Sequence, residues 1–394
     1  MAKRRALILT GLDVGTSETV AIIADGGAGV PRILGEGRCP STGLHKGAVR
    51  EPESTAKCVK KALEMAEKAA GIKATSVYAG YNSVNSGVRA GRLVFTAGDI
   101  HRMRNGGFQH MAPGDFALSG IPSGERILYI IPGTFSDQVK TRADKDALVI
   151  TGDSGEIEML VSSIKMAGFS VEEVVYTPLA GAAALLSPAE IELGTVLMDI
   201  GAETASVSLF NRGFLKNTVV LPVGGGHVVS DLAVGLRTSW SQAEEILKNF
   251  GRLSPYEDEP SKEIEISGLD GLESKTVSGE MVTKIIEARV LEIIDLAGSA
   301  LKYFGYSGLL PGGVVLTGCI AQLPGLAGIA EKQLELPVRV KTVELGGRAY
   351  CVSCTNAIGL VKYGAFKHSQ DGNGSIVSKL IGGFRERVFI SGKK

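Results

Sequence analysis

The sequence contains the same strand–turn–strand unit twice, and this repeat constrains the fold more than any other feature. LTGLDVGTSETVAIIADGG occurs near the N-terminus, and TVLMDIGAETASVSLFNRG occurs near the middle of the chain. Asp13 and Gly15 of the first copy fall opposite Asp199 and Gly201 of the second. In each copy an apolar run, an Asp-apolar-Gly turn and an alternating run predict two strands joined by a tight turn. The repeat, in a chain of 394 residues, predicts two lobes, each led by one copy.

Two such units facing one another would surround a single cleft with two anion sites and two carboxylates. Turns that contain glycine let backbone N–H groups close on phosphate oxygens. Asp13 and Asp199 are hard oxygen donors of the kind that Mg²⁺ prefers, either directly or through its waters. Either turn alone could be an ordinary β-turn. The pair predicts a site for a phosphate-bearing ligand with Mg²⁺.

Two later glycine-rich stretches lead to the same cleft. Gly224–Gly226 end a predicted strand and precede a predicted helix, and glycines at a helix N-terminus let a ligand approach closely. A plain turn at the start of the helix is the alternative. LPGGVVLTGCIAQLPGL is typical of a buried strand that runs into a turn, where Gly318 could pack flat against an adenine ring.

The composition argues against several classes of function. The 42 basic and 42 acidic side chains cancel, so the chain as a whole has no electrostatic footprint for nucleic acid. It contains no run of about 18 apolar residues. Its N-terminus, MAKRRALILTGLD, passes directly into a strand-like run without a signal-peptide pattern. We therefore expect a cytoplasmic protein without a nucleic-acid partner.

The five cysteines are an odd number at irregular spacing, which argues against a disulfide framework. Cys351 and Cys354 have CxxC spacing, but no second pair of ligands accompanies them. The surrounding AYCVSCTNAIGLVKYGAF is typical of a small-residue helix packed in a core. We expect buried small side chains here rather than a redox or zinc site.

The order of these features resembles the superfamily of actin, sugar kinases and heat-shock chaperones, and within it the FtsA family of bacterial cell-division proteins. Besides the two turns, the resemblance rests on GRCPSTGLHKGAVREPEST, VGGGHVVSDLAVGLRTSWSQAEEI, VSGEMVTKIIEARVLEII and VVLTGCIAQLPGL, which cover both lobes. It implies an α/β, actin-like ATPase fold with ATP between two lobes, each a mixed β-sheet flanked by helices. It also implies a small α+β insertion subdomain in place of one actin subdomain.

The resemblance further implies a division of the chain into subdomains. The insertion would span residues 83–172, with strands in GVRAGRLVFT, ERILYIIPGTFS and DALVITG and an amphipathic helix in GEIEMLVSSIKMAGF. The apolar residues expected on that helix are Ile157, Leu160, Val161, Ile164 and Met166. The other expected segments are residues 1–82, 173–192 and 345–366 for the first-lobe core, 193–226 and 288–344 for the second-lobe core, 227–287 for a second-lobe small subdomain, 367–375 for a linker and 376–390 for an amphipathic helix.

On this resemblance ATP and Mg²⁺ would be held where the loops of both lobes meet. Asp13 and Asp199 would hold the Mg²⁺. The residues expected to contact ATP are Gly15, Thr16, Ser17, Gly201, Ala202, Glu203, Thr204, Gly224, Gly225, Gly226, Glu244, Lys248, Gly318 and Cys319.

Four positions depart from the family's pattern. Glu18 stands where the family has Lys, and Glu203 where it has Gly. Both acids would repel the phosphates unless they are turned away or bridged by metal. Leu247 replaces a ribose-contacting Lys, for which the neighbouring Lys248 could substitute. Cys319 replaces the second glycine of the adenine loop.

Thr177 bears on turnover. Actin-like proteins commonly carry a carboxylate at the corresponding helix start, where it orients the attacking water, whereas this stretch is Tyr-Thr-Pro-Leu-Ala. Loss of a general base of this kind slows hydrolysis by roughly 10²–10⁴-fold. We therefore expect nucleotide binding with slow or no hydrolysis, so that the chain is at most a slow ATPase.

The C-terminal stretch SIVSKLIGGFRERVFISGKK follows a polar, glycine-containing linker, KHSQDGNGS. Its apolar residues share one helical face and basic residues flank them, as in a helix that lies in a membrane interface. FtsA-like proteins carry a membrane-targeting helix at this place. A helix docked on the protein's own core is the alternative. The residues expected to meet the membrane are Ile376, Val377, Leu380, Ile381, Phe384, Val388 and, at the edge of the face, Arg385.

The resemblance implies a scaffold of cell division. It would be peripheral on the cytoplasmic face of the membrane at the division site, polymerise with itself, bind the C-terminal peptide of FtsZ through residues 227–287, and meet lipids and other division proteins. Polymerisation would multiply the weak membrane affinity of each helix. The alternatives are a PilM-like adaptor of the same fold, for which no terminal membrane helix is expected, and an actin-fold sugar kinase, which needs an aspartate base in the cleft.

Overall fold

The computed structural model describes residues 6–27, 30–94, 117–119, 122–131, 144–253, 263–268, 274–305 and 310–368. The expected amphipathic helix, residues 376–390, lies outside these ranges with all its expected membrane-contacting residues. The same holds for the expected linker from residue 369 onward, because Lys367 and His368 belong to the last described helix.

The first lobe is built on a five-stranded sheet in the order β11-β6-β1-β2-β3. β1 pairs antiparallel with β2 and parallel with β6, so the sheet is mixed. Leu12 and Ile23 pack under α1 and α3, whereas Val20 and Ile22 pack against α4 and α10 on the other face. The bounds are β1 Ile8–Val14, β2 Glu18–Asp25, β3 Arg32–Pro40, β6 Ser76–Tyr81, β11 Ser170–Tyr176, α1 Pro52–Ala70, α3 Ser154–Met166, α4 Thr177–Leu185 and α10 Thr355–His368.

The second sheet has nine strands, in the order β18-β17-β12-β13-β14-β7-β10-β9, with β8 paired to β7. One registered pair, Val219 with Gly87, joins β14 to β7 and so connects the second-lobe strands to the strands of the expected insertion. The bounds are β7 Gly87–Val94, β8 Ala117–Ser119, β9 Glu125–Ile131, β10 Asp144–Asp153, β12 Thr195–Ile200, β13 Ala205–Asn211, β14 Phe214–Leu221, β17 Val314–Gly318, β18 Val338–Val340 and α5 Pro188–Leu193.

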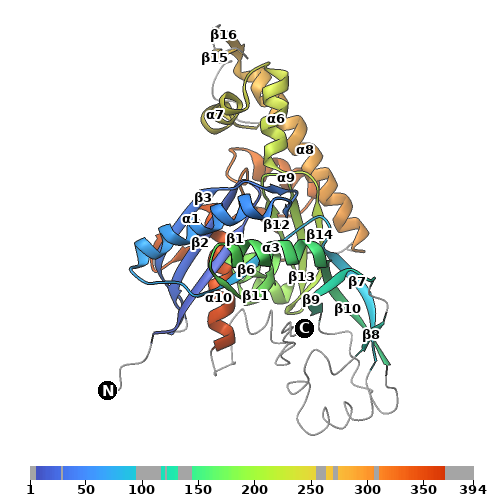
Figure 1. Ribbon diagram of the computed structural model, residues 1–394. Coiled ribbons are helices and arrows are strands. Elements are labelled where there is room, and N and C mark those ends of the chain that lie inside the picture. The colour runs from blue at the N-terminus through green and yellow to red at the C-terminus, as the bar shows by residue number, and fades with distance from the viewer. Residues whose placement is uncertain are drawn as a thin grey trace.

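A tall extension rises from the second sheet, as Figure 1 shows at the top of the molecule. It consists of α6 (Gly225–Gly235), α7 (Trp240–Phe250), the N-terminal end of α8 (Gly279–Tyr303) and the hairpin of β15 (Glu263–Ser267) and β16 (Ser274–Ser278). α9 (Leu326–Leu334) packs lower down beside α8. Short pairs elsewhere are β4 Leu44–His45 with β5 Ala48–Val49 and β19 Glu344–Leu345 with β20 Arg348–Ala349.

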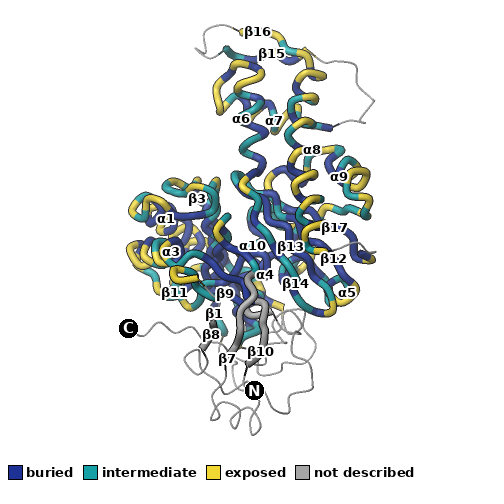
Figure 2. The backbone as a smooth tube through the Cα atoms, turned by 90° about the vertical axis from the view of Figure 1, so that its right-hand side faces the viewer, coloured by how far each residue is buried: buried dark blue, intermediate teal, exposed yellow. Residues whose placement is uncertain are grey.

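The two lobes meet through α4 and α10, which lie buried in the middle of the molecule in Figure 2. One hydrophobic cluster draws residues from both sheets, for example Ile22 of β2 and Phe210 of β13. Small residues let the two helices approach closely: a Cβ on Gly359 would lie 1.9 Å from the Ala180 carbonyl oxygen. The start of α10 is therefore held firmly against both lobes.

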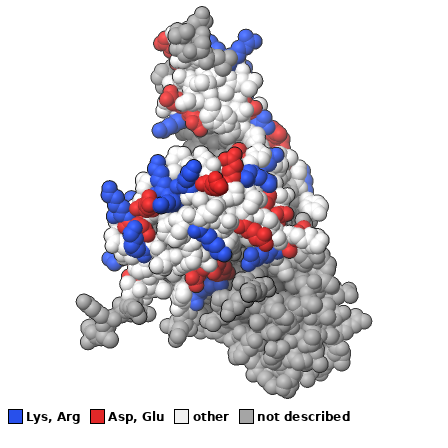
Figure 3. All heavy atoms as spheres, in the orientation of Figure 1, with Lys and Arg blue, Asp and Glu red and all other residues white. Residues whose placement is uncertain are grey.

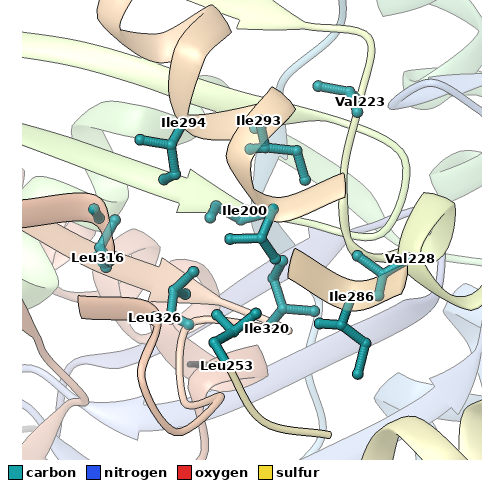
Figure 4. Close-up of a cluster of buried hydrophobic side chains, with 14 of the residues drawn as sticks. Ile200, Val223, Val228, Leu253, Ile286, Ile293, Ile294, Leu316, Ile320 and Leu326 are labelled. Carbon is teal, nitrogen blue, oxygen red and sulfur yellow. The ribbon is translucent and has the colours of Figure 1, made fainter. Parts of the chain in front are cut away.

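The core of the second lobe reaches up to the end of β12. Figure 4 shows Ile200 surrounded by apolar side chains from several elements, among them Val228 of α6, Ile286 of α8 and Ile320 after β17. Ile200 is fully buried. The last residue of this strand is thus fixed by packing, immediately before the loop that follows it.

The strands and the helix expected in the insertion are confirmed as β7, β9, β10 and α3. The expected apolar face of α3 was wrong at one position. Ile157, Leu160 and Ile164 are buried, but Met166 is 51% exposed. Met166 lies two residues beyond Ile164, about 200° around the helix, and so on the opposite side. The subdomain boundaries themselves stay a prediction.

On the surface in Figure 3, basic and acidic side chains of the described residues are interspersed. Such mixing gives this face no large field of one sign. Among the helices in the described part of the chain, none combines the length and the apolar composition needed to cross a membrane.

Candidate functional site

The two repeated units contain loops of the same geometry between their strands. The first loop, residues 15–17, joins β1 to β2, and the second loop, residues 201–204, joins β12 to β13. In the first, the Gly15 N–H donates to the Glu18 carbonyl at 3.1 Å, and in the second the Gly201 N–H donates to the Thr204 carbonyl at 2.8 Å. The repeat predicted from the sequence is therefore confirmed as a repeat of backbone structure.

Asp13 and Asp199 occupy matching strand positions just before these loops and line one cavity. Burial, with the charge of Asp199, raises the pKa of Asp13 to about 7. Burial also raises the pKa of Asp199. The Asn356 amide donates to Asp199 Oδ2 at 3.2 Å and lowers both pKa values in part. Two enclosed carboxyls that resist ionisation together are well suited to a divalent cation, which favours the charged form of each.

Two adjoining cavities lie at the loops. The smaller, of about 350 Å³, is bounded by both loops, both aspartates and the start of α4. The larger, of about 990 Å³, extends along α6, α7 and the turn after β17. These volumes match those of clefts that hold small molecules and cofactors.

All the residues predicted to contact ATP or Mg²⁺, except Gly224, line at least one of the two cavities. The smaller is lined by Asp13, Gly15, Asp199, Gly201, Thr204 and Gly318, the larger by Glu203, Gly225, Gly226, Glu244 and Lys248, and both by Thr16, Ser17, Ala202 and Cys319.

Asn82 and Asn356 also line the smaller cavity, and the sequence reasoning missed both. Their Oδ1 atoms are buried and have no hydrogen-bond partner among the described protein groups. Buried polar oxygens usually have a partner, and these two adjoin the paired aspartates. The donor set of two carboxylates and two amide oxygens fits Mg²⁺ and its waters.

Comparison with known proteins agrees with this geometry. The family model described as "Cell division protein FtsA" matches residues 196–359. The cell division protein FtsA of Bacillus subtilis (strain 168) is 30% identical over 343 residues, which cover 84% of this chain and 77% of that protein. The chain belongs to the FtsA family of cell-division proteins.

Solved structures agree on the fold. A chain of a PilM–PilN type IV pilus biogenesis complex has a TM-score of 0.67 at 16% identity and covers 92% of this chain and 99% of its own. MreB5 of Spiroplasma citri bound to ADP has a TM-score of 0.58 at 15% identity, and the match covers 89% of this chain and 94% of the MreB5 chain. The expected α/β, actin-like fold is thus confirmed.

Glu203 of the second loop, an acid where the FtsA family has glycine, is turned away from the loop's own backbone. Its Oε2 accepts a hydrogen bond from the Lys46 N–H at 2.6 Å and lies 3.2 Å from His45 Nδ1. His45 and Lys46 belong to the β4–β5 hairpin of the first lobe, which the sequence reasoning did not connect to the site. Glu203 therefore joins the two lobes along the wall of the larger cavity, which all three residues line.

Glu18, the acid directly after the first loop where the FtsA family has lysine, has a basic neighbour. Its Oε2 lies 3.9 Å from Arg38 Nη1, on the adjacent strand β3. Arg38 is held in place by a 2.7 Å hydrogen bond from its Nε to Glu36 Oε1. The charge of Glu18 is thus partly balanced within the first lobe.

The family's glycine triplet serves the protein's own packing as well. The N–H groups of Gly225 and Gly226 donate to the carbonyls of Gly201 and Ala202 at 2.8 and 2.7 Å. A Cβ on Gly224 would lie 2.4 Å from the Gly201 carbonyl oxygen. The start of α6 is therefore anchored directly on the second loop, which is a reason for glycine at Gly224 that involves no ligand.

The turn after β17 packs behind the same loop. Gly318 has a φ of +100°, a conformation that favours glycine, and its Cβ would lie 2.2 Å from the Ile200 carbonyl oxygen. The next residue, Cys319, donates its N–H to that oxygen at 2.8 Å. Its side chain is exposed at the cavities, and its thiol donates to the Gly201 carbonyl oxygen at 3.2 Å. Cys319 is therefore part of the wall of both cavities.

Thr177 stands at the start of α4 and lines the smaller cavity. A Cβ on Gly80 would lie 3.0 Å from Thr177 Oγ1 and 3.2 Å from Asp13 Oδ1, so the hydroxyl and the carboxyl flank the same glycine. The position at which the family resemblance expects a carboxylate thus lies beside Asp13.

Proposed function

We propose that this FtsA-family chain binds Mg·ATP in the two adjoining cavities. The backbone N–H groups of the first and second loops would hold the phosphates, Asp13 and Asp199 the Mg²⁺, and Glu244 and Lys248 the ribose. The observation that carries the proposal is the pairing of two enclosed aspartates, each at the end of a repeated strand, in one cavity. The bound ADP of the structurally similar MreB5 supports it.

Calorimetry with Mg·ATP tests this proposal. Asp199→Ala should weaken binding at least tenfold, because it removes half of the carboxylate pair. Asp295→Asn, at an exposed site on α8, is the matched control and should bind as the wild type does. Unchanged affinity of Asp199→Ala would remove Asp199 from the site.

Hydrolysis would be slow, because Thr177 stands where a carboxylate would orient the attacking water. Thr177→Glu should raise the rate of phosphate release at least tenfold by restoring such a group. Thr177→Val is the control and should release phosphate no faster than the wild type. A wild-type rate equal to that of Thr177→Glu would refute the proposed role of the threonine.

The proposed biological role is that of a membrane-attached scaffold at the division site. The C-terminal residues 376–390 would lie in the cytoplasmic face of the membrane, with Phe384 and its apolar neighbours in the interface. Liposome flotation of the full chain and of a chain ending at residue 374 tests this role. Equal flotation of both chains would contradict it.

Head-to-tail self-association and attachment of FtsZ, through its C-terminal peptide and residues 227–287, complete the proposal, with other division proteins as further partners. Both rest on membership of the FtsA family. Electron microscopy on a lipid monolayer tests self-association, and ordered rows that need both lipid and ATP are expected. Rows that form equally well without nucleotide would separate polymerisation from the Mg·ATP site.

A PilM-like adaptor is the second candidate, favoured by the likeness to the PilM–PilN complex. It predicts nucleotide binding without flotation. A sugar kinase is less well supported, because Asp13 and Asp199 are the only aspartates among the described residues that line the cavities, and both are assigned to Mg²⁺. Phosphate transfer to a panel of sugars would revive that candidate.

A further inference from the structure

The two cysteines with CxxC spacing do not lie as the sequence suggested. Cys354 is buried, but Cys351 is only half-buried and stands before the short 3₁₀ turn η2 (Val352–Cys354) that leads into α10. Their Sγ atoms are 3.3 Å apart. Closing a disulfide requires a further approach of only about 1.2 Å, because an S–S bond is about 2.05 Å long.

A guanidinium lies against both sulfur atoms. Arg38 donates from Nη2 to Cys351 Sγ, and also to Cys354 Sγ at 3.2 Å. Its Nη1 donates to Ser353 Oγ at 3.1 Å, and that hydroxyl lies 3.2 Å from Cys351 Sγ. Such an arrangement stabilises a thiolate, the reactive form of cysteine, on the more exposed of the two sulfurs.

The pKa of Cys351 agrees with this geometry. The hydrogen bond from the Cys354 thiol, then Ser353 and Arg38, lower the pKa of Cys351 against the opposing effect of burial. Cys351 is thus suited to be the attacking thiolate, and Cys354 to be the resolving thiol.

We propose that Cys351 and Cys354 form a redox-active dithiol that closes to a disulfide, with Cys351 as the attacking sulfur. With a low-molecular-weight disulfide as oxidant, the Cys351 thiolate forms a mixed disulfide and releases one thiolate. Cys354 then attacks the Cys351 sulfur, loses its proton to the solvent, and releases the second thiolate. The dithiol loses two electrons, and the oxidant is reduced to two thiols.

A metal site is the competing interpretation. Sulfur and oxygen atoms of Cys351, Cys354 and Glu36 lie within 4.8 Å of one another. Three ligands of this kind could serve a soft cation. Arg38 argues against it, because its guanidinium contacts all three side chains and already supplies the positive charge that a cation would bring.

The dithiol adjoins the proposed nucleotide site. Val352 and Ser353 of η2 line the smaller cavity together with Asn356, which donates to Asp199. Arg38 also lies near Glu18, directly after the first loop. Oxidation would tighten the η2 turn and remove the thiolate that holds Arg38. The shape of the smaller cavity would change as a result, because η2 residues line it. This coupling rests on the proposed function, whereas the thiol chemistry does not.

The test uses the full-length protein equilibrated in reduced and oxidised glutathione, followed by differential alkylation and peptide mass mapping. In the wild type we expect an intramolecular Cys351–Cys354 disulfide. Cys354→Ser should accumulate glutathione on Cys351, because no resolving thiol remains, whereas Cys351→Ser should leave Cys354 reduced. Arg38→Gln should slow the modification of Cys351 about tenfold, and Arg38→Lys should do so less.

Cys39 and Cys58 provide an internal control, because both are buried and burial with their mutual contact raises the pKa of Cys39. They should stay reduced under the same conditions. The proposal would be overturned if Cys351 and Cys354 stayed reduced as well. It would also be overturned if each chain bound one zinc ion that protected both thiols from alkylation. Equal Mg·ATP affinity of the reduced and oxidised wild type would overturn the coupling alone, and absence of ATP binding in both forms would count against the proposed function instead.

Discussion

The first and second loops have the same backbone turn and the same preceding aspartate, but their surroundings differ. The carbonyls of Ile200, Gly201 and Ala202, in and before the second loop, accept N–H groups from other segments. The donors are Cys319 after β17 and Gly225 and Gly226 at the start of α6. The first loop is held by the residue that follows β3, through the Ser41 N–H on the Ser17 carbonyl at 2.9 Å, and by the turn of the β4–β5 hairpin, through the Gly47 N–H on Thr16 Oγ1 at 3.3 Å. The second loop is fixed by a helix start and a turn of its own lobe, and the first loop by two connecting segments of its own lobe.

The acids near the two loops also have different partners. Glu203 reaches out of its lobe to the hairpin of the first lobe, whereas Glu18 stays beside Arg38 in its own sheet. The comparison suggests that the shared turn and aspartate serve the ligand, and that the divergent contacts serve the relation of the lobes to one another.

The largest expected effect concerns what the loops share. Asp13→Asn and Asp199→Asn should each weaken Mg²⁺-dependent ATP binding at least tenfold, because each leaves one enclosed carboxylate to face the cation alone. Titrations with ATP at several Mg²⁺ concentrations measure this, with Asp295→Asn as the control. A large loss in one variant and none in the other would show that the two loops are not equivalent.

The second effect concerns the stability of the protein without Mg²⁺. Asp13, with its pKa raised to about 7, keeps a proton in the folded protein at pH values where the unfolded chain has lost it. The free energy of unfolding therefore falls as pH rises from about 4 to about 7 and stays low above that. Asp13→Asn removes this loss, which is on the order of 4 kcal/mol. Its Tm should exceed that of the wild type increasingly from pH 5 to pH 8.

Asp295→Asn should keep a constant Tm difference from the wild type over the same range, since its site is exposed. Saturating Mg²⁺ should reduce the advantage of Asp13→Asn at pH 8, because the cation stabilises the charged pair. A pH-independent gap between Asp13→Asn and the wild type would contradict the enclosed, protonated Asp13.

The third effect probes the fixed position of the second loop. Gly224→Ala should lower the free energy of unfolding by about 2 kcal/mol, because its Cβ has no room beside the Gly201 carbonyl oxygen. Gly328→Ala on α9, where nothing lies within 4 Å of the added Cβ, is the matched control and should be neutral or stabilising by up to about 1 kcal/mol. Denaturant unfolding measures both. Equal stability of the two variants would mean that α6 does not brace the loop.

The shared part of the loops was predictable from the sequence, because local pattern decides it. The two Asp-apolar-Gly turns and the flanking strands are set by residues close in the chain, and the structure has them at β1–β2 and β12–β13. The strands of the expected insertion were predictable for the same reason.

The divergent part was not predictable, because it depends on contacts between distant segments. Glu203 and Lys46 are 157 positions apart, as are Asn356 and Asp199. No local pattern indicates that an acid in one loop meets a backbone N–H in another lobe. The sequence identified Glu203 as out of place beside a phosphate, but only the fold supplies its partner.

The smallest expected effect concerns Glu203 itself. Glu203→Ala removes the hydrogen bond to the Lys46 N–H, a loss of about 1 kcal/mol, and should speed release of a fluorescent ATP analogue about fivefold by loosening the contact between the lobes. Glu18→Ala should change the release rate less than twofold, because its pair with Arg38 is long and half-exposed.

If Glu203 faced the phosphates, its removal would relieve repulsion, and Glu203→Ala would bind ATP more tightly and release it more slowly. Slower release from Glu203→Ala, or equal behaviour of the two variants, would mean that the acid in the second loop does not join the lobes. Faster release from Glu203→Ala alone would show that the second loop has acquired a contact between the lobes that the first loop lacks.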